Sequence, residues 1–334
     1  MTIDGLSRLS ELSLKQLHHL TDVRIKACEN LASLFVEDLS KLAYLEVEEC
    51  RALDVLSFKK LNTLAHLKLR ACSTLQALLL KDLISLENLD VTWCGGLKKL
   101  KMQQLNALVK ITIDQPGYLE ALPSDQTSNL THLTFYQCFG LQDNPLAPLI
   151  NLTHLTFDGC HDIPNLHLEN LNKLTHLDIS DCHKLQLLHL ERLISLENMD
   201  IATCPALEIL IAEHLNTLTN VRVTACEKLE ELPVNGVSNL VNLVVDQCKS
   251  LASLPLEALF YLKNLEVTAC GELQLLSLAA DSCLETLMLK NCPKLHVFLP
   301  AREMPHLQIL TIENCSVLPP KTVSRFQEQA MANQ

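Results

Sequence analysis

Cysteine is the residue in this chain whose type and spacing most suggest chemistry. Most of the cysteines form a regular series along the chain, and Pro116 occupies one of its places. Cys315 resumes the series after one inserted residue, and Cys283 lies outside it. A thiol can act as a nucleophile, a metal ligand, half of a disulfide or a buried packing group. Twelve of the 14 cysteines stand at steps of 22 residues, with one double step of 44: Cys28, Cys50, Cys72, Cys94, Cys138, Cys160, Cys182, Cys204, Cys226, Cys248, Cys270 and Cys292.

This spacing favours a packing role for the cysteines. A nucleophile needs one activated thiol beside a base, not a column of thiols. No CxxC pair occurs, which excludes a zinc ribbon. Neighbouring thiols in a stack of strands would lie about 4.8 Å apart with parallel side chains, a poor approach for a disulfide. We therefore expect buried thiols that donate weakly to backbone carbonyls, with Cys283 as the candidate exposed thiol.

Histidine is the second candidate for chemistry, because it recurs six residues before the cysteine. Three of these imidazoles, His132, His154 and His176, are adjacent in the repeat and could bind zinc. In other repeats this position is asparagine, which cannot replace histidine as a zinc ligand. The pattern therefore favours a ladder of side-chain hydrogen bonds. We expect no metal and no cofactor. Asparagine holds the same position in other repeats, at Asn88, Asn198, Asn220, Asn242 and Asn264.

The elements that position these side chains follow from the aliphatic residues between the cysteines. Leu64, Leu67 and Leu69 stand eight, five and three residues before Cys72, and the same spacing recurs after it. The repeat is thus two halves of 11 residues, LxxLxLxxC and LxxLxLxxL. The LxL core has the period of a strand, and a repeat of this length indicates a solenoid. Each coil is predicted to place one short strand on either side.

The repeat resembles the leucine-rich repeat family over residues 6 to 315, about fourteen units. The resemblance implies a parallel β-sheet on a concave face, with Val23, Ile25, Leu45 and Val47 on its buried side. The second half is too short for a helix. We therefore predict short extended or 3₁₀ segments on the convex face, and few helices.

The chain is predicted to form one solenoid domain, because a solenoid grows by adding units and needs no second core. The predicted boundaries are 1–318 for the repeats and 319–334 for a C-terminal capping helix or tail. Thr322 is the expected N-cap of that helix, with Val323, Phe326 and Ala330 on its apolar face.

Composition excludes several classes of partner. A net charge of -12 argues against nucleic acid and anionic membranes, and no apolar run reaches the roughly 20 residues that span a bilayer. The amino terminus lacks the pattern of a secretory signal, and unpaired cysteines suggest a reducing compartment. We expect a cytoplasmic monomer, with secretion as an effector without a standard signal peptide as the alternative.

The outward positions of the strands before each cysteine vary most and are expected to carry specificity. Trp93 and Tyr136 are candidate interface anchors, and a solvated acidic face is the alternative. Nearer the start, charges alternate in sign between Arg24 or Lys26 and Glu46 or Glu48, which would favour a partner with complementary bands. The predicted partner-binding residues are Asp90, Trp93, Asp114, Tyr136, His154, Asp158, His176, Asp178, Asp181, Asp200, Arg222 and Asp246.

These features predict a non-enzymatic scaffold that binds another protein. The CxxLxxLP phrase at Cys226, Leu229, Leu232 and Pro233 resembles repeats of plant intracellular immune receptors and of repeat-only bacterial effectors, which implies an effector or immune-type recognition module. The alternative is an extracellular adhesion or surface-recognition module. An enzyme would need a converging nucleophile, base and pocket, and the sequence offers none.

Overall fold

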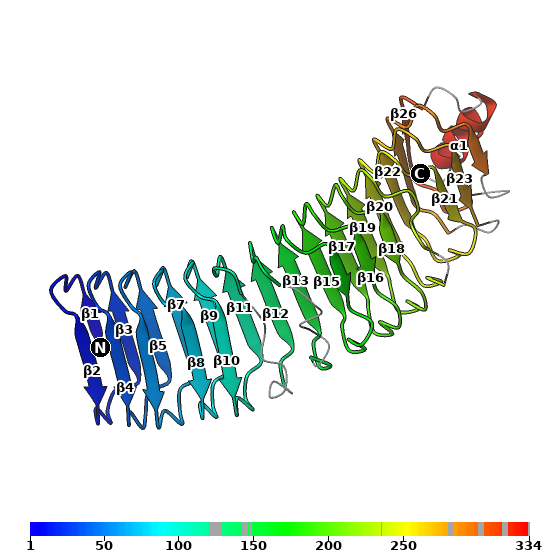
Figure 1. Ribbon diagram of the computed structural model, residues 1–334. Helices are drawn as coiled ribbons and strands as arrows, with labels where there is room; N and C mark the ends of the chain where they lie inside the picture. Colours follow the sequence, from blue (N-terminus) through cyan, green and yellow to red (C-terminus); the bar gives the residue numbers. More distant parts are fainter. Residues whose placement is uncertain are drawn as a thin grey trace. The chain divides into compact units, whose positions relative to one another are not determined.

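The computed structural model describes residues 1–119, 129–141, 146, 149–234, 236–279, 283–299, 304–315 and 320–332. It contains two compact units, Met1–Ile163 and Pro164–Gln334. Within each unit the chain winds as a coil of short strands, and each half-repeat supplies one strand in nearly every coil (Figure 1). The predicted β-solenoid is confirmed.

The strands that precede the cysteines form one parallel sheet in each unit, here called the front sheet. Equivalent residues of successive repeats pair directly, so that Leu67 lies between Leu45 and Leu89. The first unit's front strands, in order, are β1 (Thr2–Asp4), β3 (Asp22–Lys26), β5 (Tyr44–Glu48), β7 (His66–Arg70), β9 (Asn88–Thr92), β11 (Lys110–Asp114), β12 (His132–Tyr136) and β13 (His154–Asp158). Those of the second unit are β15 (His176–Ser180), β17 (Asn198–Ala202), β19 (Asn220–Thr224), β20 (Asn242–Asp246), β22 (Asn264–Thr268), β24 (Thr286–Lys290) and β26 (Ile309–Glu313).

The second halves of the repeats form shorter parallel sheets, here called the back sheets. In the described residues these segments are extended and none is 3₁₀, so the strand-like reading of the second half is confirmed. The first unit has β2 (Glu11–Lys15), β4 (Ser33–Glu37) and β6 (Val55–Lys59) in one sheet, and β8 (Ala77–Lys81) with β10 (Lys99–Gln103) in another. The second unit has β14 (Asn165–His167), β16 (Leu187–His189) and β18 (Ile209–Ile211) in one sheet, and β21 (Ser253–Leu256), β23 (Leu275–Leu278) and β25 (Val297–Leu299) in another.

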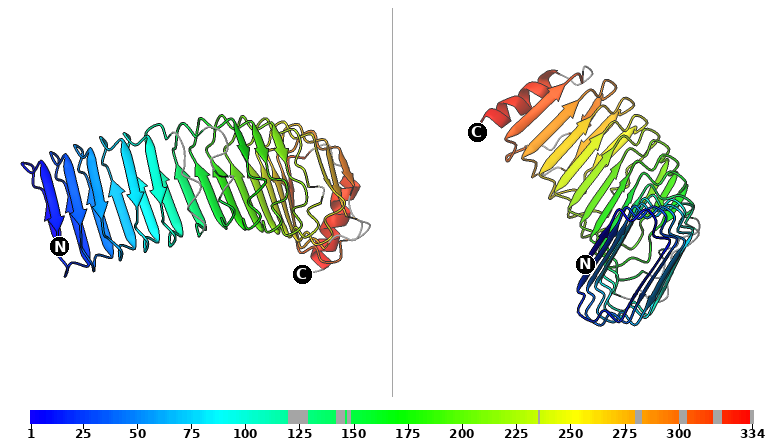
Figure 2. Two further views of the ribbon diagram at one scale, coloured as in Figure 1. Left: turned by 60° about the horizontal axis from the view of Figure 1, so that its bottom comes forward. Right: turned by 90° about the vertical axis from the view of Figure 1, so that its left-hand side faces the viewer.

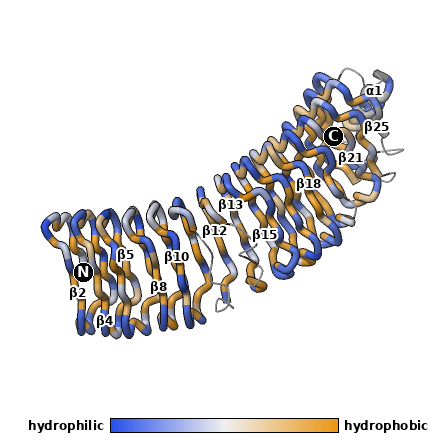
Figure 3. The backbone as a smooth tube through the Cα atoms, in the orientation of Figure 1, coloured by the Kyte–Doolittle hydropathy of each residue, from blue (hydrophilic) through white to orange (hydrophobic). Residues whose placement is uncertain are grey.

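The hydrophobic core of each unit lies between its front and back strands. Along many front strands, such as β7 and β9, buried apolar residues alternate with more exposed polar ones (Figure 3), because successive side chains of a strand point to opposite faces. Val23, Ile25, Leu45 and Val47 are fully buried, as predicted. On the back side, Leu78 and the equivalent leucines of other repeats close the same core.

Each coil turns sharply where a front strand ends, at the residue before the cysteine. This residue has a left-handed backbone with φ between 47° and 55° in twelve repeats, from Ala27 to Asn314. Gln115, before Pro116, has φ of 45°, and Gly159 takes the same place at 66°. Such backbone is uncommon for residues with a side chain. Here it is stabilised because the N–H donates to the next coil, as from Ala71 to the Thr92 carbonyl at 2.9 Å. Viewed along the stack, the coils of the first unit overlay as flattened loops (Figure 2).

One helix follows the repeats, α1 (Pro320–Ala332), and it packs against β26. Ala330 is buried as predicted. Thr322 is not the N-cap, because the helix already begins at Pro320, where proline suits the first turn. The side chains of Val323 and Phe326 lie outside the described residues, and the boundaries 1–318 and 319–334 stay a prediction. Among the described residues, no helix has the length and apolarity needed to cross a membrane.

Candidate functional site

The cysteine column lies in the core and carries no exposed chemistry. All 14 cysteines are free, and the 13 members of the column are buried. Each column thiol lies 3.4 to 3.7 Å from the carbonyl oxygen two residues earlier, a weak hydrogen bond at the end of the strand. Burial raises the pKa of Cys50 and of Cys248 to about 11. Cys50 and Cys248 are therefore protonated near neutral pH, and the prediction of a buried cysteine column is confirmed.

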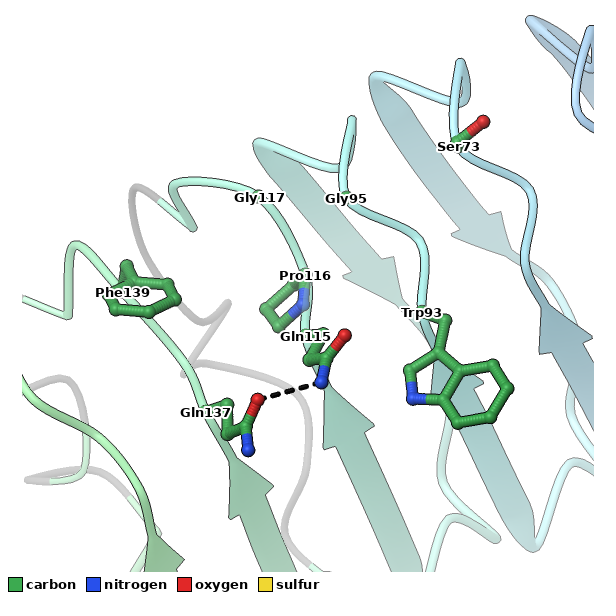
Figure 4. Close-up of a pocket in the computed structure, with 8 residues that line it drawn as sticks. All are labelled: Ser73, Trp93, Gly95, Gln115, Pro116, Gly117, Gln137 and Phe139. Carbon is green, nitrogen blue, oxygen red and sulfur yellow. Dashed lines mark hydrogen bonds between the residues drawn. The ribbon is translucent and has the colours of Figure 1, made fainter. Parts of the chain in front are cut away.

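The most distinctive surface feature of the first unit is a groove beside the ends of strands β9, β11 and β12. Its volume is about 510 Å³. Figure 4 shows Trp93 at one end, Phe139 at the other, and Pro116 with two glutamines between them. Gln115 Nε2 donates to Gln137 Oε1 at 2.7 Å. The lining residues are Ser73, Trp93, Gly95, Gln115, Pro116, Gly117, Gln137 and Phe139.

The groove exists because the repeat is interrupted at this point. Pro116 is buried in the place of a cysteine, and two glycines follow the strand ends nearby. A Cβ atom on Gly117 would lie 2.3 Å from the carbonyl oxygen of Gly95, so only glycine can occupy this position without moving the chain. The absence of side chains at Gly95 and Gly117 leaves open space between the aromatic rings.

Trp93 forms the exposed aromatic end of the groove. It is 46% exposed, and the guanidinium of Arg70 lies 4.4 Å from the centre of its ring, a cation–π contact. Its backbone N–H donates to the Asp114 carbonyl at 2.8 Å. This contact and the left-handed φ of Trp93 hold the indole at the strand end, beside the acidic residues of the front sheet.

Acidic residues line the front sheet next to the groove. Asp114, Tyr136 and Asp158 stand in register on neighbouring strands. Burial raises the pKa of Asp114, and the carboxylates of Asp90 and Asp158 raise it further, against a hydrogen bond from Trp93. Burial also raises the pKa of Asp90, whose Oδ1 is buried without a hydrogen-bond partner in the described part of the chain. The carboxyl groups of Asp90 and Asp114 are thus partly dehydrated.

The second unit carries the rest of the predicted residues on its own front sheet. Asp178, Asp200 and Arg222 are in register on β15, β17 and β19. Burial raises the pKa of Asp200, and its Oδ1 is buried without a hydrogen-bond partner among the described residues. Asp181 is exposed at the strand end, whereas Asp246 accepts hydrogen bonds from Gln247 and Thr268. Arg222 is the only cation of the predicted set.

The histidine and asparagine column forms the hydrogen-bond ladder that was predicted. In the second unit Asn198 Nδ2 lies 3.0 Å from His176 Nε2, and Asn220 Nδ2 donates to Asn198 Oδ1 at 2.7 Å. Asn242 and Asn264 continue the ladder at 2.5 and 2.6 Å. In the first unit the rings of His132 and His154 stack with centroids 4.3 Å apart, and their Nδ1 atoms meet the neighbouring Thr131 and Thr153 hydroxyls.

The alternating charges near the start pair with each other across the strands. Lys26 Nζ lies 2.8 Å from Glu48 and 3.6 Å from Glu46, and Arg70 lies 3.5 Å from Glu48. The hydrogen bond with Lys26 lowers the pKa of Glu48. These charges therefore neutralise one another within the front sheet, which leaves less of them available to attract an oppositely charged partner.

None of the twelve predicted partner-binding residues is buried. Of these residues only Trp93 lines the groove. Asp114, Tyr136 and Asp158 lie side by side on the neighbouring strands β11, β12 and β13. The other residues that line the groove were not predicted from the sequence. Two features of the sequence do indicate irregular packing there: Pro116 replaces a cysteine of the series, and glycines stand nearby. One further cluster, His167, Glu169 and His189 on the second unit's back sheet, has ligand atoms close enough to hold a metal ion.

The 22-residue repeat, the parallel front strands and the buried cysteine column define a leucine-rich repeat solenoid. Such scaffolds commonly bind proteins or peptides and are generally not enzymes. No protein-family model and no curated protein matches the chain.

Several solved structures are similar to this chain in fold. The functional domain of InlJ from Listeria monocytogenes, which includes a cysteine ladder, is 15% identical over 78% of this chain and 74% of that chain, with a TM-score of 0.36. CroV588, a circular leucine-rich repeat protein, is 18% identical over 88% and 53%, with a TM-score of 0.45. A leucine-rich repeat protein of Leptospira interrogans is 15% identical over 92% and 90%, with a TM-score of 0.32. At these identities the likeness concerns the fold alone.

Proposed function

We propose that this protein is a non-enzymatic scaffold whose front sheets bind a partner protein with a basic contact surface. The observation that carries the proposal is the buried Oδ1 of Asp90 and of Asp200, to which no described residue donates a hydrogen bond. A dehydrated carboxylate gains most from a charge-assisted hydrogen bond, which a lysine or arginine of a partner would supply.

The groove of the first unit would receive an apolar side chain of the same partner. Its volume of about 510 Å³ lies within the usual size of a binding pocket. Exposed tryptophan at the rim of such a pocket is a common source of binding energy. The acidic row Asp114 to Asp158 adjoins the groove, so a basic residue next to an apolar anchor would engage both.

A cytoplasmic effector or immune-type role is the more specific proposal. The 14 free cysteines support a reducing compartment, because thiols persist there. The alternative is an extracellular adhesion module. Titration of free thiols on protein isolated from its natural source separates the two, since a secreted protein would carry paired or blocked cysteines.

The binding proposal is tested by charge reversal on one face against the same reversal on the other. The test variant combines Asp158→Lys, Asp178→Lys and Asp200→Lys on the front sheets. The control combines Glu11→Lys, Asp82→Lys and Glu213→Lys, at exposed carboxylates of the back side, which changes the net charge equally. Partners are captured from an extract of the source with wild type and both variants, and identified by mass spectrometry. We expect loss of the partner with the test variant and retention with the control; retention with both, or equal loss with both, contradicts the proposal.

The groove is tested separately with Trp93→Ala. Loss of a buried tryptophan contact typically costs about 2 kcal/mol, so the dissociation constant of the captured partner is expected to rise at least about tenfold. Ile84→Ala removes an equally exposed side chain, 50% accessible against 46%, away from the groove and serves as the control. If calorimetry gives the two variants equal affinity for the captured partner, the groove does not contribute to binding.

A further inference from the structure

We propose that His167, Glu169 and His189 form a binding site for a divalent transition metal, with Zn²⁺ as the preferred ion. The site lies on the back sheet of the second unit, apart from the front residues assigned to partner binding. The expectation of no metal was based on the histidines of the front column, which lie on the other side of the coil.

The strand register brings the two histidines together. His167 ends β14 and His189 ends β16, and the two residues are direct partners in the parallel pair. Their ring centroids are 5.7 Å apart at an interplanar angle of 67°. The next residue in the column is Ile211, so within this sheet the imidazole pair is confined to two neighbouring coils.

Carboxylates stand beside both rings, because each histidine is followed two residues later by a glutamate. Glu169 Oε2 lies 4.0 Å from His167 Nδ1, and Glu191 Oε2 lies 3.3 Å from His189 Nε2. One ligand atom from each of His167, Glu169 and His189 can be chosen so that all lie within 4.8 Å of one another. Four ligand atoms at about 2.0 to 2.1 Å from one zinc ion would be closer together than this, so the side chains must draw in slightly on binding.

Two of these atoms lack the hydrogen bonds that buried polar atoms normally have. Glu169 Oε2 and His189 Nε2 are both buried, and neither has a hydrogen-bond partner in the described part of the chain. The side chain of His189 is 22% exposed and that of Glu169 is 33% exposed, so the cluster borders solvent and a small side-chain rotation gives an ion access to the two atoms. A nitrogen and an oxygen lone pair held out of water near each other are satisfied together by a cation.

The donor set selects the kind of ion. Two imidazoles and a carboxylate suit zinc and other divalent transition metals, whereas calcium and magnesium prefer oxygen ligands alone. Glu191 or water would complete the coordination. Because the ligands come from two successive coils, bound metal would join β14 to β16 and stabilise this part of the second unit.

The site is tested by calorimetric titration of the full reduced chain with ZnCl₂. We expect one equivalent of saturable binding in the wild type, and affinity at least tenfold weaker in His167→Ala, His189→Ala and the nearly isosteric Glu169→Gln. His154→Ala, on the front column, is the matched control and is expected to bind as the wild type does. Circular dichroism checks that each variant is folded.

Titration with Co²⁺ separates this site from the thiols. Nitrogen and oxygen ligands give visible d–d bands alone, whereas thiolate ligands add an intense near-ultraviolet charge-transfer band. The proposal predicts the first spectrum, and its loss in the His167→Ala, His189→Ala double variant. Thiolate absorption, unchanged binding in the double variant, loss of binding in His154→Ala, or the absence of saturable Zn²⁺ binding in the wild type would each overturn it.

Discussion

The ionised form of Asp200 is disfavoured by the partial burial of its carboxyl group. Burial raises its pKa above the ordinary value of 3.8, with Arg222 acting in the opposite direction, and its Oδ1 has no hydrogen-bond partner among the described residues. A carboxyl whose folded-state pKa is raised stabilises the fold below its unfolded pKa and loses that contribution as pH rises through the folded pKa. At neutral pH the ionised Asp200 therefore lowers the stability of the solenoid.

Asp200→Asn is accordingly expected to raise the free energy of unfolding at pH 7, on the order of 1 kcal/mol, because the neutral amide carries no charge that burial disfavours. The gain should shrink as pH falls and vanish below about pH 3.8, where the wild-type carboxyl is protonated in both states. Urea denaturation at several pH values measures this. Asp54→Asn, at an exposed carboxylate, is the control, and a loss of stability at pH 7 in Asp200→Asn would contradict the account.

At the residue scale, the repeat was sufficient to predict which side chains point inward. Leu67, Leu69 and Cys72 are buried as expected, because a period of two and a fixed 22-residue register leave one choice of face. The left-handed residues could not be predicted in this way. Ala71, Trp93 and Thr203 adopt φ of 52° to 55° without the glycine or asparagine that signals such a turn. Hydrogen bonds to the next coil, which no single repeat contains, stabilise them.

At the scale of elements, the asparagine ladder ties the strands β17, β19, β20 and β22 together by their side chains. Asn220 occupies its centre: it donates to Asn198 Oδ1 and accepts from Asn242 Nδ2. Asn264 is its last member and donates only to Asn242 Oδ1 at 2.6 Å in this ladder. Removing a central member therefore leaves two groups without partners, and removing the last leaves one.

Asn220→Ala is expected to destabilise the second unit by about 1 to 3 kcal/mol, and Asn264→Ala by clearly less, because unsatisfied polar groups are costly where water is partly excluded. Chemical denaturation gives the free energies, and hydrogen exchange of β19 and β20 amides shows whether the loss is local. Equal effects of the two substitutions would mean that the ladder adds nothing beyond each residue's own contacts.

The elements of the back side show the limit of prediction from the repeat. Short extended or 3₁₀ segments were predicted because the 11-residue second half of the repeat is too short for a helix, and in the described residues they are extended. Features that depend on one coil meeting the next were not foreseen. The groove needs Gly95, Pro116 and Gly117 from successive coils, and the His167 and His189 pair needs two neighbouring back strands in register. The helix start at Pro320 was missed because Thr322 offered a stronger capping signal.

At the scale of the whole molecule, the central claim is that the cysteines build the core and that function belongs to the side chains between them. A single 22-residue repeat cannot fold alone, since its apolar residues are covered only by the coils above and below. Every column thiol is therefore protected by the stack as a whole. Burial also raises the pKa of Cys50 and of Cys248 to about 11, which suppresses the reactive thiolate near neutral pH.

The most direct test is quantitative thiol labelling of the native reduced protein at about pH 7.5, well below the usual thiol pKa, with mass spectrometric mapping of the labelled sites. Cys283 is half-buried while the 13 column cysteines are buried. The account predicts rapid labelling of Cys283 alone, and labelling of all 14 thiols only in denaturant. Rapid labelling of several column thiols in the folded protein would contradict it, because it would show that the column is accessible and open to chemistry.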